Sequence, residues 1–158
     1  MRISVVKNQE GIYFVYRSTR QVYKVRITDI MYFARSGRRV TMYSRELGAV
    51  ELYCSLSEIY ELLFSDGFYY INKSVIVNLF HITNIKNNFA RIADGNCIEI
   101  SRARRTFIFS CFCGLAYVDV RNLYPHHIGT TAEGRKYIRT FRKKTSVESF
   151  IPLHPVAE

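Results

Sequence analysis

A succession of short segments rich in Val, Ile, Tyr and Phe, separated by polar residues, restricts the fold of this chain more than any other feature of its sequence. Such residues suit the pleated, half-buried surface of a β-sheet. The pattern lacks the regular strand–helix alternation of a parallel α/β sheet. It predicts a mainly β (α+β) fold of about ten short strands in small, mostly antiparallel sheets with one or two short helices. The expected strands are Ile12–Tyr16, Val22–Ile27, Ile30–Phe33, Val40–Tyr43, Val50–Tyr53, Phe68–Ile71, Val75–Val77, Ile82–Ile85, Phe89–Ala93 and Cys97–Ile100.

Three dipeptides predict tight turns between these strands. Asp94-Gly95 lies between two of the strand segments and suits a hairpin, because glycine tolerates the positive φ that such turns require. Ser36-Gly37 and Leu47-Gly48 predict two more connections of this kind.

Two helices are expected among the strands. Ser55 and Glu58 have the spacing of a capping box, in which the serine hydroxyl accepts from a first-turn N–H and the glutamate reaches back. An apolar stripe follows, and Gly67 is a stop signal. The second helix is expected to begin after Ser101 and to end at Gly114. Its apolar residues have helical spacing: Ala103, Phe107, Ile108, Cys111 and Phe112.

The charge of the chain indicates the kind of partner. With 158 residues there is room for one domain and an appendage, and the 48% of apolar residues suffice for a packed core. Lys and Arg number 23 against 13 Asp and Glu, a formal net charge of +10. This excess favours a polyanion, nucleic acid first and an anionic membrane surface second. A basic soluble domain without such a partner also fits.

The sequence shows no signal for secretion or for crossing a membrane. The N-terminal residues MRISVVKNQE contain no long apolar segment, so we expect a cytoplasmic location, where thiols are usually reduced. The most apolar segment, Phe107 to Val118, is too short to span a bilayer.

No catalytic or metal site can be assembled from the residues. Cys111 and Cys113 would lie about 200° apart around a helix, and no second cysteine pair follows to join them and His126-His127 in a metal site. The carboxylates are scattered rather than paired, which argues against a metal-dependent nuclease. We therefore expect no enzyme, no cofactor, no metal and no small-molecule substrate. Asp29 and Asn78 are expected to be hydrogen-bonded structural groups.

Arginines are concentrated in two parts of the chain. Arg35, Arg38 and Arg39 surround the Ser36-Gly37 turn, and Arg102, Arg104 and Arg105 open the second helix. Cations at a helix N-terminus are repelled by the partial positive charge of the helix. Their presence suggests that an anion such as phosphate is brought from outside. Arginine can also bind guanine through two hydrogen bonds in the major groove. Alternatively, these arginines are solvated and paired with local carboxylates.

A polar triplet lies between two apolar runs. Asn72, Lys73 and Ser74 interrupt the segment Phe68–Asn78. By composition alone such a triplet is most simply a turn between two strands.

Four motifs in order resemble those of the LytTR family of bacterial DNA-binding domains. Asp29–Phe33 is similar to a D-I-x-Y-I/F strand, and Ser55–Ile59 to an S-L-x-x-L helix start. Phe68–Asn78 is similar to an F-x-R-x-H-R/K-S-x-x-V-N segment, and Ile100–Arg102 to a closing V/I-S-R. The resemblance covers residues 2–112 with nearly the expected spacings. It implies a domain of about ten strands that presents loops, rather than a recognition helix, to successive major grooves of DNA.

The resemblance implies three loop positions that reach DNA. They correspond to Arg38 with its neighbour Arg39, to Lys73 and to Arg102. The common Arg and His of the third motif are replaced by Tyr70 and Asn72. The full set of expected DNA-binding residues is Arg35, Arg38, Arg39, Asn72, Lys73, Ser74, Arg102, Arg104 and Arg105.

The domain organisation and partners follow from the same comparison. Residues 1–112 are expected to form the LytTR-type domain, without a preceding receiver domain. Residues 113–158 are expected to be a basic extension, either partly disordered or with a short helix around Tyr137 and Phe141. The expected partners are double-stranded DNA with promoter repeats, a second copy of the chain on that DNA, and an inhibitory membrane protein. The alternative function is a non-catalytic module that binds RNA or an anionic membrane surface.

Overall fold

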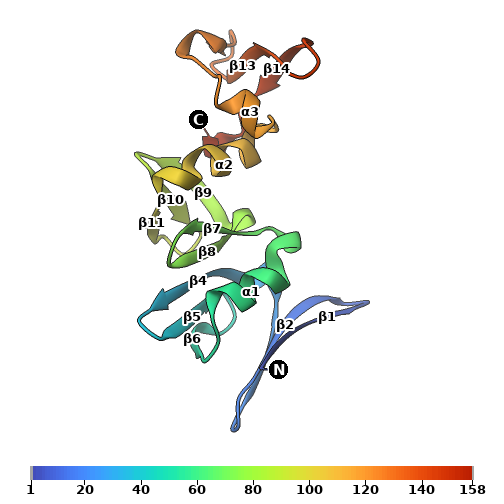
Figure 1. Ribbon diagram of the computed structural model, residues 1–158, viewed down its shortest axis with the longest axis vertical. Coiled ribbons are helices and arrows are strands. Elements are labelled where there is room, and N and C mark those ends of the chain that lie inside the picture. The colour runs from blue at the N-terminus through green and yellow to red at the C-terminus, as the bar shows by residue number, and fades with distance from the viewer. Residues whose placement is uncertain (1, 158) are drawn as a thin grey trace.

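Fourteen strands form four antiparallel sheets in the computed structural model, which describes residues 2–157. The chain rises along the longest axis, from its first two strands near the bottom to its last sheet at the top (Figure 1). The N-terminal sheet consists of β1 (Ile3–Asn8), β2 (Gly11–Arg17) and β3 (Val22–Arg26). The central sheet has the order β6-β5-β4-β8-β7. Its strands are β4 (Ile30–Ser36), β5 (Arg39–Ser44), β6 (Gly48–Leu52), β7 (Phe68–Asn72) and β8 (Val75–Asn78).

Two smaller sheets and a few short helices complete the molecule. A third sheet contains β9 (Ile82–Lys86), β10 (Phe89–Ile92) and β11 (Cys97–Glu99). The C-terminal sheet contains β12 (Ile128–Thr130), β13 (Lys136–Phe141) and β14 (Glu148–Pro152). The α-helices are α1 (Leu56–Leu63), α2 (Arg102–Cys113) and α3 (Tyr117–Val120). The 3₁₀ turns are η1 (Ile27–Asp29), η2 (Phe64–Asp66), η3 (Leu79–His81), η4 (Pro125–His127) and η5 (Pro155–Ala157).

The central sheet has apolar side chains on both faces, because successive residues of a strand point to opposite sides. Phe33 of β4 joins a cluster with the N-terminal sheet and α1, in which its ring meets Phe14 edge-on at 5.4 Å between centroids. Tyr32, the preceding residue, belongs to a second cluster with the third sheet and α2, which contributes Ile108. The central sheet is therefore held between two cores.

The expected helix signals are confirmed. The Ser55 hydroxyl accepts from the Glu58 N–H at 3.2 Å, and the Glu58 carboxylate accepts from the Ser55 N–H at 2.7 Å. The second hydrogen bond lowers the pKa of the Glu58 carboxyl. Helix α2 ends at Gly114, whose φ of 66° is the left-handed conformation that glycine adopts without strain.

The three expected turns are also confirmed. Ser36-Gly37 lies between β4 and β5, Leu47-Gly48 between β5 and β6, and Asp94-Gly95 between β10 and β11. Asp94 serves a second purpose, because its carboxylate accepts from the buried Tyr32 hydroxyl at 3.1 Å. Burial, together with the Asp94 charge, raises the pKa of Tyr32 to about 12. This contact ties the third sheet to the central sheet.

The sequence interpretation missed β1 and the C-terminal sheet. The suggested short helix around Tyr137 and Phe141 is wrong, because these residues belong to strand β13. One face of the C-terminal sheet packs Ile138 and Ile151 against Cys113 and neighbouring apolar residues of α2 and α3. The chain then returns to the second core, which Val156 joins. The region expected as a partly disordered extension therefore contacts the rest of the molecule at both of its ends.

Asn78 joins the central sheet to the turns around it. Its side-chain Nδ2 donates to the carbonyls of Ile27 at 3.3 Å and Ile30 at 3.0 Å, and its Oδ1 accepts from the Phe80 N–H at 3.1 Å. The side chain is only 2% exposed, so water cannot replace these partners. Asn78 is therefore a hydrogen-bonded structural group, as the sequence predicts.

Replacing Asn78 with alanine should lower the free energy of unfolding by about 2–4 kcal/mol, because two buried carbonyls and one N–H lose their partner. Urea unfolding followed by circular dichroism measures the change. Asn84→Ala, a truncation at an exposed position of β9, should change stability by less than about 0.5 kcal/mol. Equal losses in the two variants would contradict the role assigned to Asn78.

Candidate nucleic-acid interface

Main-chain and side-chain hydrogen bonds bring together three segments that are distant in sequence. The Arg35 N–H at the end of β4 donates to the Ser74 carbonyl at 2.7 Å. The Ser101 N–H, just before α2, donates to the Ile71 carbonyl at 3.0 Å. Asn72 Nδ2 donates to the Glu99 carbonyl at 2.9 Å. The end of β4, the β7–β8 turn and the start of α2 consequently form one continuous surface.

These segments and the start of α1 line a groove of about 990 Å³. The groove carries five cations and one carboxylate, so its charge is strongly positive. Most of the residues predicted from the sequence lie along it. The charged and polar residues that line it are Arg35, Ser55, Ser57, Tyr70, Asn72, Lys73, Ser74, Glu99, Ser101, Arg102, Arg104 and Arg105.

Three of the groove cations are exposed and have no side-chain partner within residues 2–157. They are Arg35, Lys73 and Arg102, one from each of the three segments. Arg104 and Arg105 are more constrained. The Arg104 guanidinium lies 6.0 Å from the centre of the Tyr70 ring, and Arg105 Nε donates to the Ile100 carbonyl at 3.4 Å. The unpaired cations are available to an anion without first breaking a contact.

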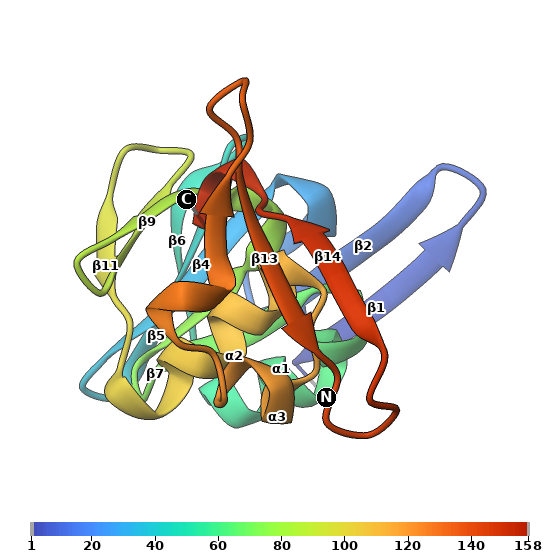
Figure 2. The ribbon, with the colours of Figure 1, turned by 90° about the horizontal axis from the view of Figure 1, so that it is seen from above.

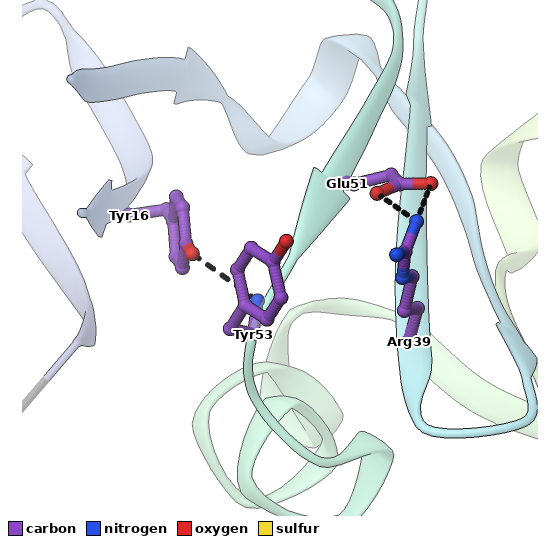
Figure 3. A network of polar contacts seen from close by, with 4 residues as sticks. All are labelled: Tyr16, Arg39, Glu51 and Tyr53. Carbon is purple, nitrogen blue, oxygen red and sulfur yellow. Dashed lines mark hydrogen bonds and ion pairs between the residues drawn. The ribbon is translucent and has the colours of Figure 1, made fainter. Parts of the chain in front are cut away.

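Arg38 and Arg39 lie outside the groove. Arg38 is exposed in the two-residue turn between β4 and β5 and has no side-chain partner in the described part of the chain. Arg39 forms an ion pair with Glu51 of β6, with Nη1 at 3.0 Å from the nearer carboxylate oxygen (Figure 3). The alternative of an arginine paired with a local carboxylate therefore holds for Arg39.

The same view shows how the chain is held as it enters α1. The Tyr16 hydroxyl accepts from the Tyr53 N–H at 3.1 Å, which fixes the segment before α1 to the N-terminal sheet (Figure 3). Ser55 follows two residues later, and the start of α1 forms one wall of the groove.

The carboxamide of Asn72 is already engaged within the fold. Besides its bond to Glu99, its Oδ1 accepts from the Ser74 N–H at 2.9 Å, which shapes the β7–β8 turn. Asn72 and Ser74 are half-buried, whereas Lys73 between them is exposed. The turn thus presents the lysine and uses Asn72 as its support.

Five of the charged and polar groove residues were not predicted as part of a binding site: Ser55, Ser57, Tyr70, Glu99 and Ser101. The sequence indicated a helix cap for Ser55, and it singled out Tyr70 only because this residue departs from the family motif. Nothing in the sequence near Glu99 indicates that it lines the groove. Its position depends on the pairing of β10 with β11, which joins residues that are not neighbours in the sequence.

The described residues offer little for metal or nucleophile chemistry. Within residues 2–157, no three His, Cys, Asp or Glu side chains lie together where they could hold a metal ion. Burial raises the pKa of the Cys54 thiol to about 11 and also raises the pKa values of Cys111 and Cys113, which keeps these thiols protonated at neutral pH. Among the described helices, none combines the length and apolar character needed to cross a bilayer.

Comparison with known proteins identifies the family. The family model of the LytTr DNA-binding domain matches residues 20–109, more than half of the chain. The chain belongs to the LytTR family. Among solved structures it is similar to the LytTr DNA-binding domain of a methyl-accepting/DNA response regulator from Bacillus cereus, with 21% sequence identity and a TM-score of 0.51. That similarity covers 76% of this chain and 98% of the other.

The comparisons confirm the predicted family and the mainly β fold, and the chain contains a LytTR DNA-binding domain. No match was found among curated proteins. The matched residues 20–109 include all three segments that line the groove, whereas the C-terminal sheet lies outside the match.

Replacing Glu51 with glutamine should strengthen binding to duplex DNA, because it releases Arg39 and removes a negative charge. One added phosphate contact should steepen the slope of log K against log salt by about 0.9. Fluorescence anisotropy with a labelled duplex over a range of salt concentrations measures this slope. Glu46→Gln, in the turn at the opposite end of β5, is the matched loss of charge. An unchanged slope for Glu51→Gln would exclude Arg39 from phosphate contact.

Proposed function

We propose that this protein is a sequence-specific transcription regulator that reads duplex DNA through the loops lining the groove and the β4–β5 turn. The observation that carries the proposal is the convergence on one groove of Arg35, Lys73 and Arg102, three cations from separate segments that have no side-chain partner in the described part of the chain. Duplex DNA carries about one negative charge for each 1.7 Å of its axis, so a face of this kind attracts it strongly. The protein acts by binding, without catalysis.

The cations divide between two tasks. Contacts with phosphates position a protein on DNA, and contacts with base edges specify the sequence. We assign Arg35, Arg39, Arg104 and Arg105 to phosphates. Arg38, Lys73 and Arg102 are assigned to base edges, because they are exposed at a turn or helix start and their side chains have no partner within residues 2–157. A loop or turn that enters the major groove meets a distinct donor and acceptor pattern at each base pair.

The start of α2 is suited to a phosphate. The Ser101 side chain makes no capping hydrogen bond and the first turn contains no acidic residue, so the helix start has no negative group of its own. Three arginines lie in that turn, and the partial positive charge of the helix adds to theirs. An anion supplied by DNA would satisfy both the N–H groups and the guanidinium groups.

Two copies would bind together at a promoter. Paired half-sites about one helical turn apart place two identical domains on the same side of the duplex. With its DNA as the partner, the protein would act in the bacterial cytoplasm.

Replacing Arg102 with alanine should weaken binding to the preferred duplex by about 1–3 kcal/mol, because contacts to a base edge are lost. The preferred sequence is first selected from a random duplex library with the wild-type protein. Anisotropy titrations then compare that duplex with a scrambled one. The loss should be larger on the preferred duplex than on the scrambled duplex, since Arg102 is assigned to base readout.

Arg20→Ala is the matched control, since it removes the same charge from an exposed turn of the N-terminal sheet. This variant should bind the preferred duplex nearly as the wild type does. Equal effects of Arg102→Ala and Arg20→Ala would remove Arg102 from the readout, and failure to select any preferred sequence would contradict sequence-specific binding.

A further inference from the structure

The outer face of the C-terminal sheet carries aromatic rings that no other part of the described chain covers. Side chains of β13 alternate, with Ile138 and Thr140 buried and Tyr137, Arg139 and Phe141 on the opposite side. Phe150 of β14 pairs with Arg139 and therefore shares that side. Seen from above, β13 and β14 lie in front of α2 (Figure 2). This outer face is named here the aromatic face: Tyr137, Arg139, Phe141 and Phe150.

The rings of the aromatic face are far more exposed than a folded chain requires. Phe141 is 66% exposed and Phe150 is 59% exposed. The inner face of the same sheet already provides the packing, because Ile138 lies at 0% exposure in a cluster with Cys113 and Leu115. The exposed rings are thus not needed to anchor the sheet, and large exposed apolar groups that lie together mark an interaction site.

Part of the face is held in a defined arrangement. The Tyr137 and Phe150 rings lie 4.4 Å apart at their centroids, inclined by 30°. Tyr137 also lies over Gly129 of β12, where a Cβ atom would overlap its ring. The Tyr137 and Phe150 rings therefore lie against each other before any partner arrives, which lowers the side-chain entropy that binding must overcome.

The charge around the aromatic face selects an anionic partner. Residues 128–152 contain six cations and two carboxylates, Glu133 and Glu148. Arg139 binds one of these carboxylates, with Nε at 2.5 Å from a Glu148 oxygen. A second copy of this sheet would bring like charges together, so self-association through this face is disfavoured. The other cations lie in or beside the two turns that flank the strands: Arg135, Lys136, Arg142, Lys143 and Lys144.

We propose that the aromatic face binds an unpaired strand of nucleic acid, RNA or single-stranded DNA. Bases stack on Phe141 and Phe150, and the cationic turns contact phosphates. Exposed rings on a sheet, flanked by cations, provide both interactions that single strands use, and every base has a face that can stack. A duplex offers its phosphates but keeps its bases stacked on one another. The proposal is independent of duplex recognition in the groove, which lies outside this sheet.

The test uses the full chain and three fluorescein-labelled probes of about 12 nucleotides per strand: oligo(U), oligo(dT) and a scrambled duplex. At equal salt concentration, the wild type should bind both single strands, and its binding of the scrambled duplex, which the groove also attracts, should not change in the variants below. Phe141→Ala and Phe150→Ala should each lower affinity for oligo(U) by about 5- to 100-fold. Binding to the preferred duplex should be retained in both variants. Phe80→Ala, which truncates an 83% exposed ring elsewhere, should bind oligo(U) as the wild type does.

A second measurement does not depend on loss of function. The chain contains no tryptophan, so Phe141→Trp places a single indole on the aromatic face while preserving a stacking ring. Its fluorescence should be quenched saturably by oligo(U). Absence of quenching, or unchanged oligo(U) affinity in both alanine variants, would overturn the proposal. An equal loss of scrambled-duplex and oligo(U) binding in the two alanine variants would assign the face to duplex phosphates. Equal displacement of oligo(U) by polyglutamate would assign it to an acidic protein.

Discussion

The arrangement of the groove depends on the join between the end of β7 and the chain that enters α2. The Ser101 N–H binds the Ile71 carbonyl, and the Asn72 side chain binds the Glu99 carbonyl. These two hydrogen bonds link the central sheet to the third sheet where the β7–β8 turn meets the start of α2. Because Lys73 follows Asn72 directly and Arg102 follows Ser101, the same bonds set the spacing of two groove cations. The residues that hold the two segments together and the groove cations are thus adjacent in the sequence.

Features that depend on neighbouring residues could be predicted from the sequence. The capping box of Ser55 and Glu58, the left-handed Gly114 and the Asp94-Gly95 hairpin each involve residues a few positions apart, so their signals are local. The strand β13 could not be told from a helix. Tyr137 and Phe141 are four residues apart, a spacing that places two side chains on one side of a helix and also on one face of a strand. Only pairing with β14, which the sequence does not reveal, decides between them.

The candidate site was predictable in outline for the same reason. Clusters of arginine and the Asn-Lys-Ser triplet are visible in the sequence, and the fold brings the segments that carry them onto one surface. Their partners are not visible, because contacts between strands join residues that are distant in sequence. Glu51 reaches Arg39 across two paired strands, and Glu99 reaches the groove through a hairpin. Opposite charges alone would not have indicated which arginine is paired.

The close approach of Tyr137 to Gly129 has a consequence for how this sheet can evolve. No residue larger than glycine fits at position 129 while the ring lies over it, so a mutation there becomes tolerable only after the aromatic residue at 137 has shrunk or moved. The two positions are therefore expected to vary together among relatives that contain this sheet. A lineage that loses the glycine should hold the ring at 137 in another position or replace it, which would change the aromatic surface without touching the groove of the family domain.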